Sequence, residues 1–290
     1  MSYKIDTIEA RCAAHAPLSS NGHFASGTVF GDWRITAFIG RGGNGEVYCA
    51  EHVALGTPAA VKVLIRDGER AEYRFEGEAK LLARLRSEAF PRFYTYGEAN
   101  GAVYLAMELL EPGELPSGNK NVARFLLEIC TAVAELHAQG LVHRDIKPEN
   151  ILWRDQQPVL ADFGLVKDVS QSSNRSIRQL PEQPTTLAGT PGYAAPEQME
   201  RGEVSFAADI HALGVLADRC FNGNPPRSWA RIIMRATSSI PAHRYSVVDE
   251  LMHAIRWRNL WRNVGKAALV LFLVGLLVDI LIVAVVIWLW

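Results

Sequence analysis

Hydrophobic and polar positions follow two periodicities, which predict a strand-rich first part of the chain and a helix-rich second part. Alternating runs at Trp33–Ile39, from Glu46 onward and at Ala59–Ile65 predict strands, and the apolar run Val103–Leu110 predicts another. A Pro-Gly break at positions 112–113 follows the last run, as expected for a hinge between two lobes.

Apolar residues at helical spacing predict two helices. The first covers Ala71–Leu85, and Glu78 lies beside its apolar stripe. The second covers Asn121–His137, and Gly140 ends it because glycine readily adopts the conformation that closes a helix. These helices would pack against the predicted strands through their apolar faces.

The last segment of the chain has a different composition. Between positions 267 and 290 the only charged residue is Asp279, and 17 residues are Leu, Ile, Val or Phe. A helix of this length would measure about 36 Å, whereas a bilayer core requires roughly 20 residues. The segment therefore predicts one membrane-spanning helix, with Trp288 and Trp290 at its far interface. Basic residues suit its near, cytoplasmic interface: Arg256, Arg258, Arg262 and Lys266.

These patterns divide the chain into five parts. They are an extension without stable structure over residues 1–30, a first lobe over 31–110, a second lobe over 111–256, a basic juxtamembrane linker over 257–266 and a transmembrane helix over 267–290. Positive residues stay on the cytoplasmic side, so the two lobes are expected in the cytoplasm of a single-pass membrane protein. Lipid is thus an expected partner, and a homodimer through the membrane helix or the lobes is left open.

Composition narrows the range of functions. Lys and Arg number 30 against 31 Asp and Glu, which does not favour a nucleic-acid partner. The four cysteines are scattered without close pairs, so neither a disulfide framework nor a zinc site is expected. The main domain therefore belongs in a reducing compartment.

A glycine-rich turn and a lysine provide the first candidate chemistry. Gly40–Val47 reads G-R-G-G-N-G-E-V and lies between two predicted strands, where a bare backbone can approach phosphate oxygens closely. Lys62 is the one charged residue of the next apolar strand. Glu78 is its preferred partner, with Glu76 and Glu72 as alternatives on the same helix.

The stretch His143–Asn150, H-R-D-I-K-P-E-N, provides the second set of candidate groups. Asp145 can accept a proton, Lys147 can neutralise a phosphate and Asn150 can hold a metal ion. Asp162 follows as the first residue of Asp-Phe-Gly and adds a second metal-binding group. Together these are the parts that phosphoryl transfer needs.

With these motifs in order, the chain resembles the eukaryotic-type (Hanks-type) serine/threonine protein kinases, bacterial members included, from about Trp33 to Arg256. The resemblance also uses Ala195-Pro196-Glu197 and Ala208-Asp209-Ile210. It implies an α+β, bilobal kinase fold, with a small β-rich N-lobe and a mainly helical C-lobe, here followed by the transmembrane helix. It also implies protein substrates and the cofactors ATP and Mg²⁺, with Mn²⁺ as an alternative.

The resemblance assigns roles to individual residues. Asp145 would take the proton of the substrate hydroxyl, Lys147 would neutralise the transferred phosphoryl group, and Lys62, held by Glu78, would contact the α- and β-phosphates. Asn150 and Asp162 would hold the metal, and Thr190 could bridge Asp145 and Lys147. The nucleotide site would comprise Ile39, Gly40, Arg41, Gly42, Gly43, Asn44, Gly45, Val47, Ala60, Lys62, Met107, Glu108, Leu110 and Leu152.

Two features favour Ser/Thr substrates, and a third suggests control by phosphorylation. Lys147 follows Asp145 by two residues, and Gly189–Tyr193 precedes the Ala-Pro-Glu motif, as in Ser/Thr members. Arg144 could pair with a phosphate on the Ser/Thr-rich loop of residues 168–190, where Thr186 is the favoured position.

Some features depart from the family or leave alternatives. The chain between Asp209 and Arg244 is short, which puts the docking of protein substrates in question. Arg244 is expected to pair with Glu197 as a structural ion pair, and His143 to pack under Phe163. The rival functions are a catalytically silent pseudokinase scaffold at the membrane and a small-molecule kinase.

Overall fold

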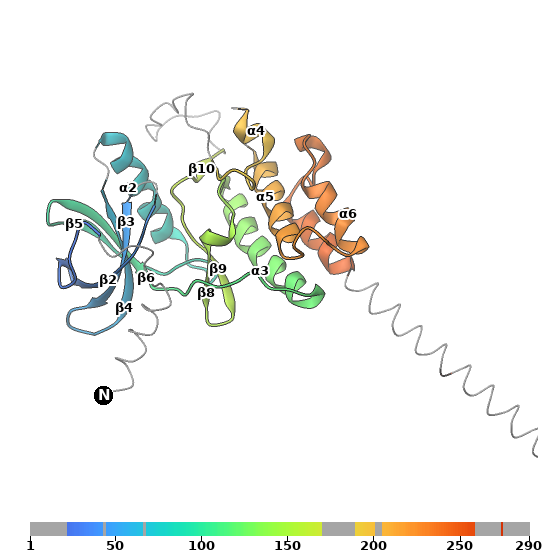
Figure 1. Cartoon of the computed structure of the whole chain (residues 1–290). Helices are drawn as coiled ribbons and strands as arrows, with labels where there is room; N and C mark the ends of the chain where they lie inside the picture. The colour runs from blue at the N-terminus through green and yellow to red at the C-terminus, as the bar shows by residue number, and fades with distance from the viewer. Residues whose placement is uncertain are drawn as a thin grey trace, which may run out of the picture.

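The computed structural model describes residues 22–42, 45–65, 68–169, 189–200, 205–258 and 274. Within these ranges the chain forms a β-rich N-lobe and a mainly helical C-lobe, seen at the left and right of Figure 1. The bilobal α+β architecture expected from the sequence is confirmed.

The N-lobe is built on a six-stranded antiparallel sheet with the strand order β1-β2-β3-β4-β6-β5. Its strands are β1 (Val29–Phe30), β2 (Trp33–Arg41), β3 (Gly45–His52), β4 (Pro58–Leu64), β5 (Phe93–Ala99) and β6 (Ala102–Glu108). The β2–β3 hairpin carries the glycine-rich turn at its tip, because Arg41 pairs with Glu46 across it.

The side chains of β4 alternate between two environments, as the period of a strand requires. Ala59, Val61 and Val63 lie in the cluster on the outer face of the sheet, together with Tyr48 of β3. Lys62 therefore lies on the opposite face, which is directed toward helix α2 and the C-lobe. This alternation directs one buried lysine toward α2 and the C-lobe.

Helix α2 (Glu69–Arg84) packs between the sheet and the C-lobe (Figure 1). Its acidic first turn and basic last turn suit the helix dipole. Its buried face joins the core cluster that extends into the C-lobe, and contains Phe75, Glu78, Ala79, Leu81 and Leu82. Glu78 is thereby directed inward from a predominantly apolar face.

The C-lobe is formed around three helices, α3 (Asn119–His137), α5 (Phe206–Arg219) and α6 (Arg227–Ala236). Residues 248–258 form a further helix. The shorter elements of the C-lobe are β7 (Leu141–Val142), η2 (Pro148–Asn150), β8 (Ile151–Arg154), β9 (Gln157–Leu160), β10 (Lys167–Asp168), α4 (Pro196–Met199) and η3 (Pro241–His243). The β8–β9 hairpin lies between the sheet and α3 (Figure 1).

The structure corrects the expected beginning of the N-lobe. The sequence placed residues 1–30 in an extension without stable structure, but residues 22–30 pack on the sheet. Phe30 is fully buried, and the ring of Phe24 meets it edge-on with centroids 4.9 Å apart. These two aromatic rings help to dock a segment that the sequence analysis placed in the extension.

The described residues confirm that the chain between α5 and Arg244 is short. Between α5 and Arg244 these residues form only α6 and η3, and a seven-residue connection, 220–226, joins the two helices. Because Arg244 still reaches Glu197 with N–O distances of 2.6 and 2.8 Å, the shortening does not disturb this ion pair.

The end of the C-lobe also differs from expectation. Residues 257–258, which were expected to begin the linker, belong to the helix of residues 248–258. The Arg258 guanidinium lies 4.2 Å from the ring centre of Trp229 and donates hydrogen bonds to Asn119. Arg258 is therefore packed against the C-lobe and is only 9% exposed.

The expected membrane helix of residues 267–290 lies outside the described residues, apart from Val274. Among the residues that are described, no helix combines the length and apolarity that crossing a bilayer requires.

Candidate active site

The first part of the site joins the N-lobe sheet to helix α2. Lys62 Nζ donates to both carboxylate oxygens of Glu78, at 2.7 and 2.8 Å. The alternative partner Glu76 instead lies at the surface, where it pairs with Lys80. Burial alone would lower the pKa of Lys62, but the carboxylates of Glu78 and Asp162 raise it, so the ammonium stays charged.

Asp162 brings the C-lobe to the same lysine. Its Oδ1 lies 3.3 Å from Lys62 Nζ, and 48% of its side chain is exposed toward the cleft. The charge of Lys62 lowers the pKa of Asp162 despite burial of the surroundings. Asp162 has a φ of 61°, in the left-handed region that non-glycine residues rarely occupy except at functional positions.

Asp145 is the centre of the second part of the site. Thr190 Oγ1 donates to its Oδ1 at 2.7 Å, Lys147 Nζ lies 2.8 Å from its Oδ2, and Asn150 Nδ2 donates to Oδ2 at 3.0 Å. Lys147 Nζ also donates to Thr190 Oγ1 at 2.7 Å, so the expected bridge is present. The carboxylate is only 7% exposed and is oriented by three independent groups.

Asp209 of α5 fixes the segment His143–Asn150, which we call the catalytic loop. This carboxylate is fully buried and accepts hydrogen bonds from the backbone N–H groups of His143 and Arg144, at 2.8 and 2.9 Å. His137 Nε2 lies 2.9 Å from the same carboxylate. His143 packs edge-on against Phe163 with centroids 5.7 Å apart, as expected for a structural histidine.

The oxygen atoms of the site suit a magnesium ion. Asn150 uses its amide nitrogen for Asp145, which leaves the amide oxygen as its coordinating atom. The backbone N–H of Ala161 donates to Asn150 O at 2.8 Å, which keeps the neighbouring Asp162 beside it. Two protein oxygens completed by phosphate and water are the usual magnesium arrangement, since Mg²⁺ is hard and octahedral. No cluster of three His, Cys, Asp or Glu suited to a metal occurs among the described residues.

The roof of the nucleotide site is the underside of the β-sheet. Ala60 and Cys49 form a small apolar cluster with Leu109. The partly buried residues against it are Ala37, Ile39, Val47 and Met107. A flat apolar surface of this kind suits a purine ring. Leu152, the expected floor of the site, is half-buried on β8.

The glycine-rich turn lies at the end of the β2–β3 hairpin. Gly40 and Arg41 end β2, and the N–H of Gly42 donates to Gly45 O at 2.8 Å to close the hairpin. A side chain at Gly45 would place its Cβ 2.2 Å from Val63 O, so this glycine is required for strand packing as well. Gly43 and Asn44 lie outside the described residues.

The hinge expected to bind the adenine edge is held by Glu108. Its backbone N–H donates to Arg92 O at 2.8 Å, so it has only its carbonyl to offer a base. Its carboxylate is held by Arg154, whose Nε donates at 2.8 Å. Leu110, the other expected hinge contact, is buried beside it.

The regulatory elements are described in part. Arg144, expected to pair with a loop phosphate, has a φ of 70° and donates from Nε to Leu165 O at 2.6 Å. Its guanidinium thus lies at the start of the loop after Asp-Phe-Gly. Positions 170–188, including Thr186, lie outside the described residues.

The sequence analysis did not identify two residues that position the site, Asp209 and Gln198. Asp209 was noted only as part of a motif, although a carboxylate in a buried helical face always requires donors. Gln198 of α4 accepts from Ala195 N at 2.9 Å and donates to Arg144 O at 3.0 Å, which ties the Ala-Pro-Glu segment to the catalytic loop. No local pattern marked Gln198.

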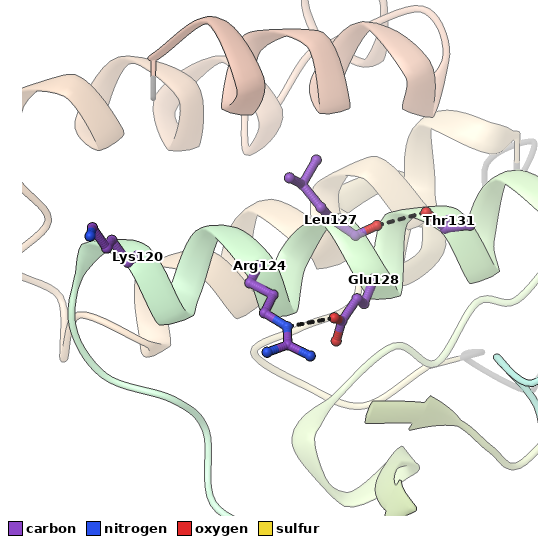
Figure 2. A pocket seen from close by; sticks show the side chains of 5 residues that line it. All are labelled: Lys120, Arg124, Leu127, Glu128 and Thr131. Atoms are coloured by element: carbon purple, nitrogen blue, oxygen red, sulfur yellow. Dashed lines mark hydrogen bonds and ion pairs between the residues drawn. The ribbon is translucent and has the colours of Figure 1, made fainter. Parts of the chain in front are cut away.

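A separate surface pocket, of about 370 Å³, lies on α3 and contains none of the expected site residues. Figure 2 shows its lining, in which Arg124 Nε donates to Glu128 Oε1 at 2.9 Å and Thr131 donates to the Leu127 carbonyl. Its remaining charged lining residue is Lys120. Its polar groups are thus largely bonded to one another.

Comparison with known proteins identifies the family. The protein kinase domain model matches residues 33–261, which is most of the chain, so the chain belongs to the protein kinase domain family. It is 34% identical over 212 residues to the serine/threonine-protein kinase PknH of Mycobacterium bovis, a match covering 69% of this chain and 34% of that protein. It is 34% identical over 213 residues to serine/threonine-protein kinase pkn2 of Myxococcus xanthus, covering 68% and 25%. The chain therefore spans about a third or less of these relatives.

Solved structures show the same fold. The kinase domain of Mycobacterium tuberculosis PknI is 26% identical and superposes with a TM-score of 0.60, covering 81% of this chain and 99% of that one. The relatives' names agree with the enzyme class expected from the motifs, serine/threonine protein kinase.

Proposed function

We propose that this chain transfers the γ-phosphoryl group of Mg-ATP to Ser or Thr hydroxyls of proteins. The observation that supports this most directly is the meeting of Lys62 and Asp162 at 3.3 Å. A strand of the N-lobe and a loop of the C-lobe thereby place a phosphate-binding cation beside a metal-binding carboxylate, while Glu78 holds the cation in position. Such preorganised charge is the main protein contribution to phosphoryl transfer.

The acceptor side of the reaction uses Asp145. The substrate oxygen forms a bond to the γ-phosphorus as the bond to the β,γ-bridging oxygen breaks, and the hydroxyl proton passes to the Asp145 carboxylate. Lys147 lies 2.8 Å from that carboxylate, where its positive charge can neutralise the phosphoryl group in transit. Thr190 is hydrogen-bonded to both Asp145 and Lys147 and so holds the two side chains together.

A bound Mg²⁺ or Mn²⁺ would neutralise phosphate charge during transfer. Asn150 and Asp162 would hold it. The cluster of Ala60, Val47 and Met107 would cover the purine and exclude water from one side of the nucleotide.

Phosphate transfer from radiolabelled ATP to a generic protein substrate tests this function. Asp145→Asn and Lys62→Met should each lower kcat by on the order of 10²–10³ or more, since each removes an essential charged group. The matched control is Lys80→Met, because Lys80 pairs with Glu76 at the surface of the same lobe. Turnover at the wild-type rate in either site variant would contradict the assignment.

The rival functions are separated by the same assay. A pseudokinase scaffold predicts no transfer by the wild-type chain, and a small-molecule kinase predicts transfer to small alcohols but not to protein. The intact set of Lys62, Asp145, Asn150 and Asp162 favours catalysis over the scaffold.

Autophosphorylation of the 168–190 loop is a further part of the proposal, with Thr186 as the favoured position. Its support is the position of Arg144 beside Leu165, at the start of this loop. Mass spectrometry of the chain after incubation with Mg-ATP provides the test. An active enzyme with an unmodified loop would contradict it.

Membrane anchoring by residues 267–290, with the kinase domain in the cytoplasm, is proposed from the sequence. Its support is the apolar run interrupted only by Asp279. The full chain should remain with membranes after carbonate extraction, whereas a chain ending at residue 258 should not. Changed crosslinking of Asp279→Leu in membranes would support a homodimer through this segment.

A further inference from the structure

Glu46 is an unusual residue of the glycine-rich hairpin, because its carboxylate is fully buried although the hairpin tip is exposed. It follows the last glycine of the turn and pairs with Arg41 across the hairpin. Burial of a carboxylate is costly unless donors surround it. The identity of those donors indicates what the residue does.

The first donors come from the segment before the kinase fold. The backbone N–H of His23 donates to Glu46 Oε2 at 2.9 Å, and His23 Nδ1 lies 2.9 Å from Oε1. The Tyr48 hydroxyl donates to Glu46 and itself accepts from the N–H of Phe24 at 3.1 Å. His23 and Phe24 are thereby hydrogen-bonded to side chains of β3.

The other donor comes from the hairpin itself. Arg41 Nε donates to Glu46 Oε1 at 2.9 Å, and its Nη2 contacts the same oxygen. Arg41 precedes the turn and Glu46 follows it, so one carboxylate joins both ends of the turn to His23. The carboxylate accepts from five donor atoms in all.

These groups lie on the side of the sheet away from the nucleotide. Tyr48 belongs to the cluster on the outer face with Phe30. Val47 instead packs against the cluster of Cys49, Ala60 and Leu109 on the other face. Glu46 alternates with Val47 and so shares the outer face. An effect of this network on nucleotide binding would therefore act through the backbone of the hairpin and not by contact.

The charges in this network are suited to a firm attachment. Burial by itself raises the pKa of Glu46, but hydrogen bonds from Tyr48, His23 and Arg41 lower it to about 2. Burial and the Glu46 carboxylate raise the pKa of Tyr48 to about 12. Glu46 is thus an anion and Tyr48 a neutral donor at physiological pH. The His23 and Arg41 side chains are 54% and 59% exposed, so these two donor side chains have room to turn toward solvent.

We propose that Gly22–Phe24 is a clamp that fixes the glycine-rich hairpin from its outer face, with Glu46 as the positioning residue that transmits its effect to nucleotide affinity. The clamp rests on the proposed function only in that the ligand under the hairpin is a nucleotide. Gly22 fits the same model, since a Cβ there would lie 2.5 Å from the Tyr48 hydroxyl oxygen. Its backbone is thus seated directly on the network.

Loss of the clamp should loosen the hairpin and weaken nucleotide binding with little change in the chemical step. His23→Ala removes the side-chain donor, and Gly22→Ala forces the segment away from Tyr48. We expect either change to raise the Kd for an ADP analogue and the KM for ATP by roughly five- to tenfold, at the low end of typical coupling between sites. The kcat and the KM for protein substrate should stay within about twofold, because Asp145 and Lys147 are untouched.

The test uses the full chain, two readouts and a matched control. Binding of a fluorescent ADP analogue with Mg²⁺ measures affinity without requiring turnover, and hydrogen exchange of the Gly42 and Gly45 amides measures the hairpin without requiring nucleotide. Thr28→Ala is the control, since its hydroxyl bonds only to Ala25 O within the same segment.

Faster exchange at Gly42 and Gly45 together with weaker nucleotide binding, in both variants but not in the control, would support the clamp. Unchanged exchange would overturn it whether or not the chain proves to be a kinase. Faster exchange with unchanged affinity would also overturn it, since the hairpin would then be loosened without consequence. Nucleotide binding without phosphate transfer by the wild-type chain would count against the proposed function alone.

Discussion

Each lobe contains a fully buried carboxylate that organises a catalytic segment, and the two differ in how they are held. Asp209 in the C-lobe accepts from two backbone N–H groups of the catalytic loop and from His137, whose side chain is itself buried. Glu46 in the N-lobe accepts mainly from side chains, and two of these are more than half exposed. Backbone donors inside a core cannot leave without local unfolding, whereas exposed side chains can rotate away.

This difference separates a fixed part of the site from an adjustable one. The loop bearing Asp145 needs one geometry to within a fraction of an ångström, because proton transfer depends on it. Under the proposed function, the hairpin would have to open for ADP to leave, and motions of this kind often limit turnover. Donors inside the core, as at Asp209, suit the loop that bears Asp145. Exposed side-chain donors, as at Glu46, suit the hairpin.

The largest expected effect comes from Asp209→Ala. It leaves the N–H groups of His143 and Arg144 buried without an acceptor, so we expect kcat to fall by on the order of 10²-fold and the free energy of unfolding by about 2–5 kcal/mol. Kinase assays and urea unfolding measure the two. Asp218→Ala, later in the same helix, is the control and should change stability by no more than about 0.5 kcal/mol. Wild-type turnover in Asp209→Ala would remove the contrast between the lobes.

A smaller and different effect is expected from Glu46→Gln. The amide keeps the shape of the side chain but loses the charge that attracts Arg41, and it adds donors where donors already converge. The KM for ATP should rise about tenfold while kcat changes less, and stability should fall by about 1–3 kcal/mol. Steady-state kinetics with ATP and protein substrate varied separately make the distinction. A fall in kcat as large as that of Asp209→Ala would show that both carboxylates act alike.

The smallest expected effect concerns pH. The difference in the free energy of unfolding between wild type and Glu46→Gln should become smaller in acid. The pKa of Glu46 is lowered from 4.5 to about 2 on folding, so its stabilisation is complete above pH 4.5 and is lost as pH falls toward 2. Urea unfolding of wild type and Glu46→Gln at pH 6 and pH 3 should therefore give a smaller difference at pH 3. An equal difference at both values would indicate that Glu46 is not held as an anion.

The catalytic residues could be predicted from the sequence because they occur in short motifs. The Lys62–Glu78 pair could be predicted as the preferred pairing, because Lys62 is the one charged residue of an apolar strand and Glu78 lies beside the apolar stripe of the next helix. Periodicity left Glu76 and Glu72 as alternatives, and the structure decides for Glu78. Strands such as β5 and the β8–β9 hairpin were missed, because β5 alternates among partly exposed residues without a clear apolar face.

Contacts between distant segments could not be predicted in the same way. His23 and Glu46 are 23 residues apart, and His23 lies just after a breaker cluster typical of a loop. The donors of Asp209 lie 65 and 66 residues away along the chain. Only the folded chain brings these partners together, and no local pattern records the pairing.

The stacking of Arg258 on Trp229 sets a limit on the reach of the enzyme. Because Arg258 is bonded to both α6 and the start of α3, the chain leaves the C-lobe from a fixed point. Eight residues, 259–266, then separate that point from the segment proposed to enter the bilayer. Fully stretched, they would extend at most about 29 Å. A kinase anchored in this way would reach only targets that come close to the lipid surface.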